Sequence, residues 1–159
     1  MASPAPALLE LLRAVDARWP ERAKASDGIM GDAAHAARAS DHNQGDALDI
    51  THDEEHGPDL EALADALMGD ERVHYVIWDR RIRNRAYEGG AWRNYDGANP
   101  HTKHLHVSIH PEQREDTRPW ALSATSPARS RLGIGLVFAG LGLAVLGVLA
   151  WGRPAQPPV

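Results

Sequence analysis

Two short segments of the chain hold the residues best suited to bind a metal ion. Residues 40–50 contain His42 and Asp49, seven positions apart. Residues 101–109 contain three further imidazoles, those of His101, His104 and His106. Two or three imidazoles and one carboxylate are the usual ligands of a catalytic zinc that keeps one position open for water. The chain has no cysteine, so a metal would be held by histidine and carboxylate side chains.

The strands that must position these side chains are predicted from the alternation of apolar and polar residues. Residues 45–51 are expected to form a strand with Asp49 on the face opposite its apolar neighbours. Residues 104–109 are expected to form another, with His106 opposite its apolar neighbours. If these strands lie side by side, the two polar side chains point into one cleft, and His42 can reach it from the preceding loop.

The remaining patterns indicate an α+β domain in which helices flank a small, mainly antiparallel sheet. Residues 6–19 are predicted to form an amphipathic helix with an apolar stripe that includes Leu9. A second helix is predicted between the turn at residues 57–59 and Gly69. Strands are further predicted at residues 73–78 and 80–85, and loops at residues 21–41 and 86–100, the first loop with a helical turn at residues 33–38.

The C-terminal part of the chain differs in composition. Residues 111–131 are rich in Pro, Ser, Thr, Ala and Arg, which is typical of a linker. Residues 132–151 then form an uncharged run of twenty, the length of a transmembrane helix of about 30 Å. A buried core helix is disfavoured because a linker and a Pro-rich tail flank the run. The predicted organisation is a metal-binding domain at residues 1–110, a linker at 111–131, a transmembrane helix at 132–152 and a tail at 153–159.

Charged residues predict the orientation of this span and argue against one class of partner. Only Arg153 follows the span, whereas four arginines precede it: Arg114, Arg118, Arg129 and Arg131. The positive-inside rule places the N-terminal domain in the cytoplasm, and residues 1–19 lack the pattern of a signal peptide. Five arginines are a small sample, so the opposite orientation stays open. A net charge of −5 argues against binding to nucleic acid.

The order of the two motifs also resembles a known group of enzymes. Ser40-x-His42-x6-Asp49 followed by His104-x-His106 is similar to the LAS-type zinc peptidases, the peptidase M15 group. That group and its relatives include D-Ala-D-Ala carboxypeptidases, phage L-alanyl-D-glutamate endolysins and the hedgehog signalling domain. The resemblance implies that His42, Asp49 and His106 bind Zn²⁺ and that Ser40 helps to hold substrate. It further implies a hedgehog/DD-peptidase-like fold and hydrolysis of peptidoglycan stem peptides, for example by a phage endolysin. Because the basic residues predict a cytoplasmic domain whereas the cell wall lies outside, one interpretation is a lysis enzyme held at the inner face of the membrane until the membrane is breached.

The chain departs from this resemblance at the general base. Many members of the group carry Glu three residues before the last ligand, where this chain has Lys103. The arrangement His101-x2-His104-x-His106 is instead similar to the penicillin-insensitive murein endopeptidases, which implies an imidazole base. His104 has the better expected geometry, and His101 is the candidate from the loop. Three carboxylates are less favoured: Asp46, Asp53 and Glu54.

Other side chains are candidates to bind the substrate. A guanidinium or ammonium group would anchor a substrate carboxylate, and the candidates are Arg38, Arg81, Arg83 and Lys103. Aromatic side chains could line the groove, and the candidates are Trp78, Trp92 and Tyr95.

Two alternative functions are weighed against a peptidase. One is a non-enzymatic, zinc-stabilised module that binds cell wall or signals; the additional imidazoles of residues 101–106 argue against it, because a purely structural site does not need them. The other is a phosphoesterase with two His-x-Ser/Thr motifs. Residues 106–108 supply one such motif, but no second copy falls on a predicted strand.

Overall fold

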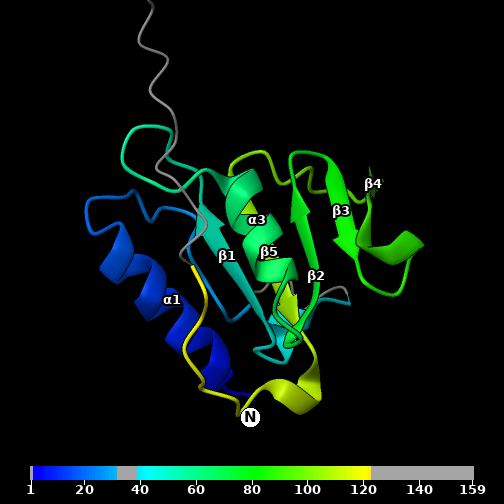
Figure 1. The fold of residues 1–159 in the computed structure, drawn as a ribbon, viewed down its shortest axis with the longest axis horizontal. Helices are drawn as coiled ribbons and strands as arrows, with labels where there is room; N and C mark the ends of the chain where they lie inside the picture. The colour runs from blue at the N-terminus through cyan, green and yellow to red at the C-terminus, as the bar shows by residue number, and fades with distance from the viewer. Residues whose placement is uncertain (1, 32–38, 123–159) are drawn as a thin grey trace, which may run out of the picture.

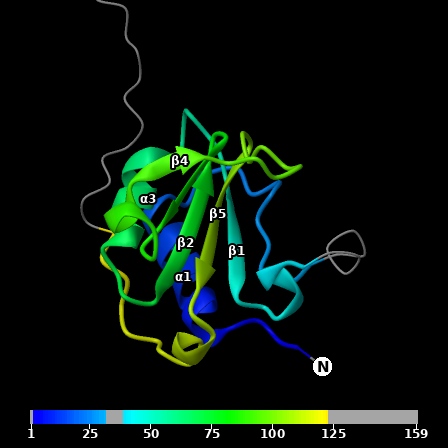
Figure 2. The ribbon, with the colours of Figure 1, turned by 90° about the vertical axis from the view of Figure 1, so that its right-hand side faces the viewer.

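A five-stranded antiparallel sheet forms the centre of the structure, with strand order β1-β5-β2-β3-β4 (Figure 1). The computed structural model describes residues 2–31 and 39–122. The strands are β1 (Ala47–Thr51), β2 (Val73–Trp78), β3 (Arg81–Asn84), β4 (Trp92–Asn94) and β5 (His104–Ile109). Figure 2 shows β5 between β1 and β2. The predicted α+β class and antiparallel sheet are confirmed.

Two helices cover one face of this sheet, α1 (Pro6–Arg18) and α3 (Leu60–Met68) (Figure 1). Pro6 begins α1, a position where its missing N–H costs nothing. Asp59 caps α3, because its carboxylate accepts hydrogen bonds from the backbone N–H groups of the first turn. The stripe predicted for α1 is wrong at one position, since Leu9 is 50% exposed and Leu11 is buried in its place.

The alternation of residues in β1 and β5 separates the core from the functional face. Leu48, Ile50, Leu105 and Val107 are fully buried and pack with the helices. Burial of each such side chain stabilises the fold by about 1.5–3 kcal/mol. Because neighbouring residues of a strand point to opposite faces, the polar residues between them must project from the side without helices. A slip by one residue would exchange the two sets, so the apolar core also fixes the register of the polar face.

A buried ion pair holds the segment between α1 and β1 against the sheet. Arg22, 3% exposed, donates to Asp16 and to both carboxylate oxygens of Asp27. Asp27 also accepts hydrogen bonds from the backbone N–H and the hydroxyl of Thr51, at 2.9 and 2.8 Å. Burial alone would raise the pKa of Asp27, but the Arg22 guanidinium and the Thr51 donors outweigh burial and lower it.

We expect Asp27→Asn to destabilise the domain by about 2–3 kcal/mol at pH 7, because it leaves a buried guanidinium short of a charged partner. The lowered pKa of Asp27 means that its contribution is complete above the unfolded value of about 3.9 and is lost as the pH falls through the folded value. Urea unfolding at pH 7 and pH 3 should therefore show a difference between wild type and variant that shrinks at pH 3. Glu21→Gln, at an exposed position, is the control, and an equal difference at both pH values would contradict the prediction.

The domain extends beyond residue 110, the boundary predicted from the sequence. Residues 111–122, predicted as the start of a linker, begin with a short 3-10 helix, Pro111–Gln113 (η3), and then lie against the body of the fold. Trp120 and Leu122 are part of the hydrophobic core, and Trp120 Nε1 donates to the carbonyl of Ala7 at 3.0 Å. Arg72, 1% exposed, stacks on the Trp120 ring at 3.6 Å. A composition typical of a linker therefore belongs, over this stretch, to a packed segment.

Two further predictions differ from the structure or fall outside it. Residues 86–100 are not only a loop, because they include β4, which pairs with β3. The helical turn predicted at residues 33–38 and the span predicted at residues 132–152 lie outside the described residues. Within the part of the chain that is described, no helix has the length and apolar character needed to cross a bilayer.

Candidate metal centre

Three ligand candidates meet on the face of the sheet opposite the helices. Pairing of β1 with β5 places Asp49 directly across from His106, and His42 reaches them from a 3-10 helix, Asp41–Asn43 (η1). His106 Nδ1 lies 3.0 Å from Asp49 Oδ1 and 3.2 Å from His42 Nε2. The His42 Nε2 to Asp49 Oδ1 distance is 3.3 Å. Three donor atoms from distant parts of the chain thus form a nearly equilateral triangle.

The dimensions of this triangle suit a tetrahedral metal ion. Nitrogen and carboxylate ligands lie about 2.0–2.2 Å from zinc, so two ligands of a tetrahedral ion are about 3.3–3.6 Å apart. The observed separations of 3.0–3.3 Å are close to that value. His42, Asp49 and His106 therefore form a group able to hold a metal ion, as the sequence predicted for these three residues.

A hydrogen bond to the backbone orients the His42 ring for this role. Its Nδ1 lies 2.8 Å from the carbonyl oxygen of Ile29, and because a carbonyl only accepts, Nδ1 must carry the hydrogen. The unprotonated Nε2 of the neutral ring then faces Asp49 and His106. A backbone carbonyl that fixes the second ring nitrogen is the common arrangement around metal-binding histidines.

The charges in the cluster also favour a cation. Burial alone would raise the pKa of Asp49, but interactions with the His106 and His42 rings, which are strongest when those rings are protonated, outweigh it and lower that pKa. Burial alone would lower the pKa of His42, whereas the hydrogen bond and charge of Asp49 raise it. A buried carboxylate so close to two imidazoles gains stability from positive charge, which a proton or a metal ion can supply.

A second carboxylate holds the turn that carries His42. Asp41 Oδ2 accepts hydrogen bonds from the hydroxyl of Tyr75, at 2.9 Å, and from that of Ser108. Burial and the neighbouring Asp41 raise the pKa of Tyr75 above its ordinary value, so its hydroxyl stays protonated and donates. The Tyr75 ring in turn stacks on His106, with centroids 5.6 Å apart. Asp41 thereby ties the turn before β1 to both β2 and β5.

The metal-ligand candidates form part of the wall of a cavity of about 210 Å³. Ser40, Tyr95 and Asn99 also line this cavity, as does His101, which is 6% exposed. The His101 ring lies 5.4 Å from that of His106, and its Nδ1 has no hydrogen-bond partner among the described residues. Burial, with the nearby His106 and His104 rings, lowers the pKa of His101 to about 4. A neutral imidazole therefore lines the space beside the cluster.

One known protein family matches a part of the chain that contains all three metal-ligand candidates. The family model described as "VldE, C-terminal domain" matches residues 2–106, more than half of the chain. The chain belongs to this family. No curated protein and no solved structure matches the chain. The description of the family names neither an activity nor a substrate. The match to the VldE C-terminal domain therefore identifies a domain over residues 2–106 without assigning its chemistry.

His104 lies beside the cluster but outside the cavity that His101 lines. It lies on the same face of β5 as His106, as predicted, and its Nε2 is 3.5 Å from Asp49 Oδ2. It does not line the cavity that contains His101; it lines a neighbouring one. In this member of the VldE C-terminal domain family, His104 therefore contacts Asp49 Oδ2, the oxygen away from His42 and His106, while His101 lines the cavity that the three ligand candidates also line.

The other candidates from the sequence are distributed unevenly around the site. Ser40 and Tyr95 line the cavity, whereas Arg38 lies outside the described residues. Arg81 and Arg83 form ion pairs on the surface, with Glu61 and Asp65 respectively. The remaining candidates have other partners in the structure: Asp46 pairs with Arg114, Asp53 accepts hydrogen bonds from loop backbone, Trp78 packs edge-on against His52, and Trp92 stacks with Arg81.

Three residues of the site were not singled out from the sequence, namely Asp41, Tyr75 and Ser108. Ser108 stands two positions after His106 in an alternating strand, so its face was predictable. Tyr75 was not, because a register irregularity between Val73 and Tyr75 interrupts the pairing of β2 with β5.

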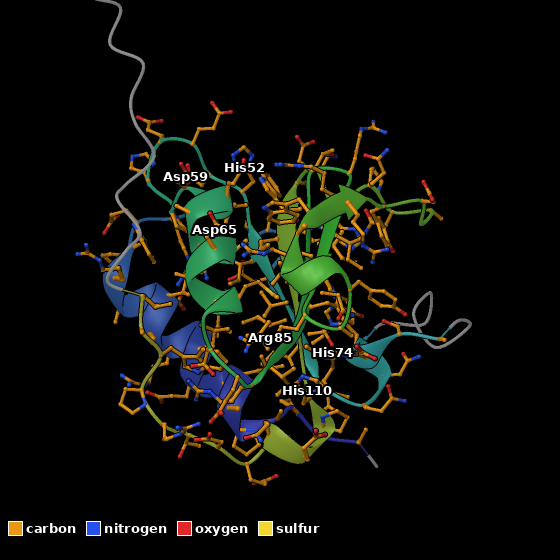
Figure 3. All side chains as sticks on the ribbon, turned by 45° about the vertical axis from the view of Figure 1, so that its right-hand side comes forward. His52, Asp59, Asp65, His74, Arg85 and His110 are labelled. Carbon is orange, nitrogen blue, oxygen red and sulfur yellow. The ribbon has the colours of Figure 1, made fainter. Side chains whose placement is uncertain are left out.

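Other histidines of the chain lie away from this cluster. His74 and His110 are neighbours at the end of the sheet where β2 begins and β5 ends, with ring centroids 4.7 Å apart (Figure 3). His52 follows β1 at the opposite end (Figure 3). Neither end contributes a donor to the triangle of His42, Asp49 and His106.

Proposed function

We propose that this chain is a zinc-dependent peptidase that hydrolyses stem-peptide bonds of peptidoglycan. The observation that carries the proposal is the triangle of His42, Asp49 and His106 at a cavity whose wall also presents His101. The substrate class comes from the resemblance of the two motifs to LAS-type zinc peptidases.

The ligand set fits zinc; the same set also serves non-haem Fe(II), so the choice of zinc rests on the resemblance of the two motifs to LAS-type zinc peptidases. Two imidazoles and one carboxylate, with no sulfur, suit a catalytic zinc that leaves a coordination position for water. When bound, zinc would supply Lewis-acid activation of water and of the scissile carbonyl group. His42, Asp49 and His106 would hold the ion, and Asp41 and Ile29 would fix the first of them through the bonds described above.

His101 is the side chain best placed to move protons in this reaction. Its ring borders the cavity beside the cluster, and burial keeps the imidazole in the neutral form that can accept a proton. Hydrolysis requires that a water molecule lose a proton as its oxygen bonds to the carbonyl carbon. His101 would accept that proton and return it to the amide nitrogen as the C–N bond breaks, which leaves a carboxylic acid and an amine.

His104 is assigned a positioning role instead. Its Nε2 contacts Asp49 Oδ2, while the other oxygen, Oδ1, faces His42 and His106. A group that binds the outer oxygen of a ligating carboxylate fixes its orientation and basicity. The sequence favoured His104 over His101 as the general base; we propose the reverse order.

Ser40 and Tyr95 are proposed to contact the peptide, because both line the cavity beside the cluster. Arg38, next to the lining residue Ala39, is retained as a candidate anchor for a substrate carboxylate. Residues 132–152 are proposed to insert in a membrane, with the N-terminal domain in the cytoplasm until the membrane is breached.

The test is to digest purified peptidoglycan with the full chain in the presence of zinc and to identify the released ends by mass spectrometry. The proposal predicts new amino and carboxyl termini within the stem peptide, absent after treatment with a chelator and absent for His106→Ala. If zinc binds but no bond is cut, the proposed activity is wrong, and a zinc-stabilised binding module is favoured.

A further inference from the structure

We propose that the cavity next to the metal centre is an anion subsite, in which Lys103 binds a carboxylate of the substrate close to the scissile bond. The proposal rests on the proposed function and names the class of substrate: a peptide with a free side-chain or main-chain carboxylate beside the bond that is cut.

The second cavity adjoins the first. It has a volume of about 320 Å³ and is lined by Ser26, Asn99, Pro100, Thr102, Lys103 and His104. Asn99 lines both cavities. The His101 and His104 rings, one in each cavity wall, are 5.0 Å apart. A peptide bound over the metal centre would therefore have a neighbouring group within reach of the second cavity.

The residues around this cavity suit a negatively charged ligand. Lys103 supplies an ammonium group, Ser26 and Thr102 supply hydroxyl groups, and no carboxylate is among the lining residues. Lys103 has no carboxylate within ion-pair distance among the described residues, whereas Lys24 lies 2.9 Å from Asp16. A lysine without a partner at the rim of a polar cavity is available to a carboxylate brought by the substrate.

The loop that carries Lys103 is held in place by backbone hydrogen bonds. The β2–β3 turn donates to it twice, from Asp79 N to the His101 carbonyl at 3.1 Å and from Arg80 N to the Pro100 carbonyl at 2.9 Å. His52, at the upper end of the sheet in Figure 3, donates from its N–H to the Lys103 carbonyl at 2.9 Å. A subsite that is already ordered loses less conformational entropy when it binds.

The backbone of His101 connects the two cavities. Its φ of 50° lies in the left-handed region, uncommon for a residue with a side chain. The His101 N–H donates to Asn99 Oδ1 at 3.1 Å, which helps to hold this conformation. The same short loop thus fixes His101 toward the metal centre and Lys103 toward the second cavity, so that one substrate can meet both.

The experiment uses the full chain and a pair of stem-peptide fragments that differ only by a carboxylate or its amide next to the scissile bond. We expect wild type to prefer the acid. Lys103→Ala should raise KM for the acid peptide by about 10-fold and leave its kcat and both constants for the amide peptide unchanged. Lys103→Glu should reverse the preference. Lys24→Ala, whose ammonium group already has a partner, should change nothing.

A binding measurement separates this subsite from the peptidase activity. Calorimetric titration of both peptides into chelator-treated protein should show about 10-fold tighter binding of the acid by wild type and equal binding by Lys103→Ala. If the titrations and KM values show no such dependence on Lys103, the subsite is wrong while the peptidase stands. If neither peptide is cut but the binding difference holds, the proposed function fails and the anion subsite stands.

Discussion

Replacement of His101 by alanine is expected to lower hydrolysis of stem peptides by about 10²–10⁴-fold, the range for loss of a general base. Zinc content should not change, because His101 lies beside the cluster and is not one of the three donors. The measurement is kcat on a defined peptide, together with the metal content of the same sample. This combination distinguishes loss of a proton-transfer group from loss of the metal.

His104→Ala is the matched control, since it removes an imidazole of the same strand and same face as His106. Because His104 Nε2 lies against Oδ2 of Asp49, behind the oxygen that faces the other two donors, we expect the substitution to weaken zinc binding by about 10–100-fold. With saturating zinc, its kcat should stay well above that of His101→Ala. If His104→Ala instead keeps its zinc affinity and loses kcat more severely, the two roles must be exchanged again.

Truncation of the chain after His110 is expected to abolish cooperative folding. The deletion removes Trp120 from the core. It also removes the carbonyl groups of Asp116 and Arg118, which accept hydrogen bonds from Arg72. Arg72 keeps its ion pair with Asp70, so the loss of the two carbonyl acceptors costs about 1–3 kcal/mol. Loss of a buried Trp costs about 3–5 kcal/mol. The sum approaches the whole stability of a typical domain, about 5–15 kcal/mol.

Thermal unfolding followed by circular dichroism tests this expectation with two truncations. A chain that ends at residue 110 should show no cooperative transition, whereas one that ends at residue 122 should unfold cooperatively. Trp120→Ala should lie between them, with a loss of about 3–5 kcal/mol. Equal transitions for the two truncated chains would mean that residues 111–122 do not contribute to the stability of the domain.

The metal cluster was predictable from sequence because it depends on a local rule. In β1 and β5 the apolar residues fix which face is buried, so Asp49 and His106 had to share the other face once the strands paired. The position of His42 required only that a short loop precede β1. The alternation of apolar and polar residues determines the register of the strands and the face on which each side chain lies. Register and face in turn determine which side chains can act as metal ligands.

Other features depend on contacts that alternation does not encode. The face of His104 was predictable, but not that His101, from a loop with a left-handed backbone, would line the cavity in its place. The packing of residues 111–122 depends on a guanidinium that binds backbone carbonyls more than forty residues away, and their Pro- and Arg-rich composition suggested a linker. The three-residue strand β4 is too short to give a periodic signal.

Metal content of the purified full chain tests the central claim most directly. We predict one zinc ion per wild-type chain by mass spectrometry of the metal after dialysis. His42→Ala, Asp49→Ala and His106→Ala should each weaken zinc binding by more than about 100-fold, since even groups behind the ligands contribute about 10–100-fold. His74→Ala, which removes a histidine at the end of the sheet away from the cluster, should keep the ion. A wild-type chain without zinc affinity, or a His106→Ala chain that binds zinc as wild type does, would contradict the assignment of the metal centre.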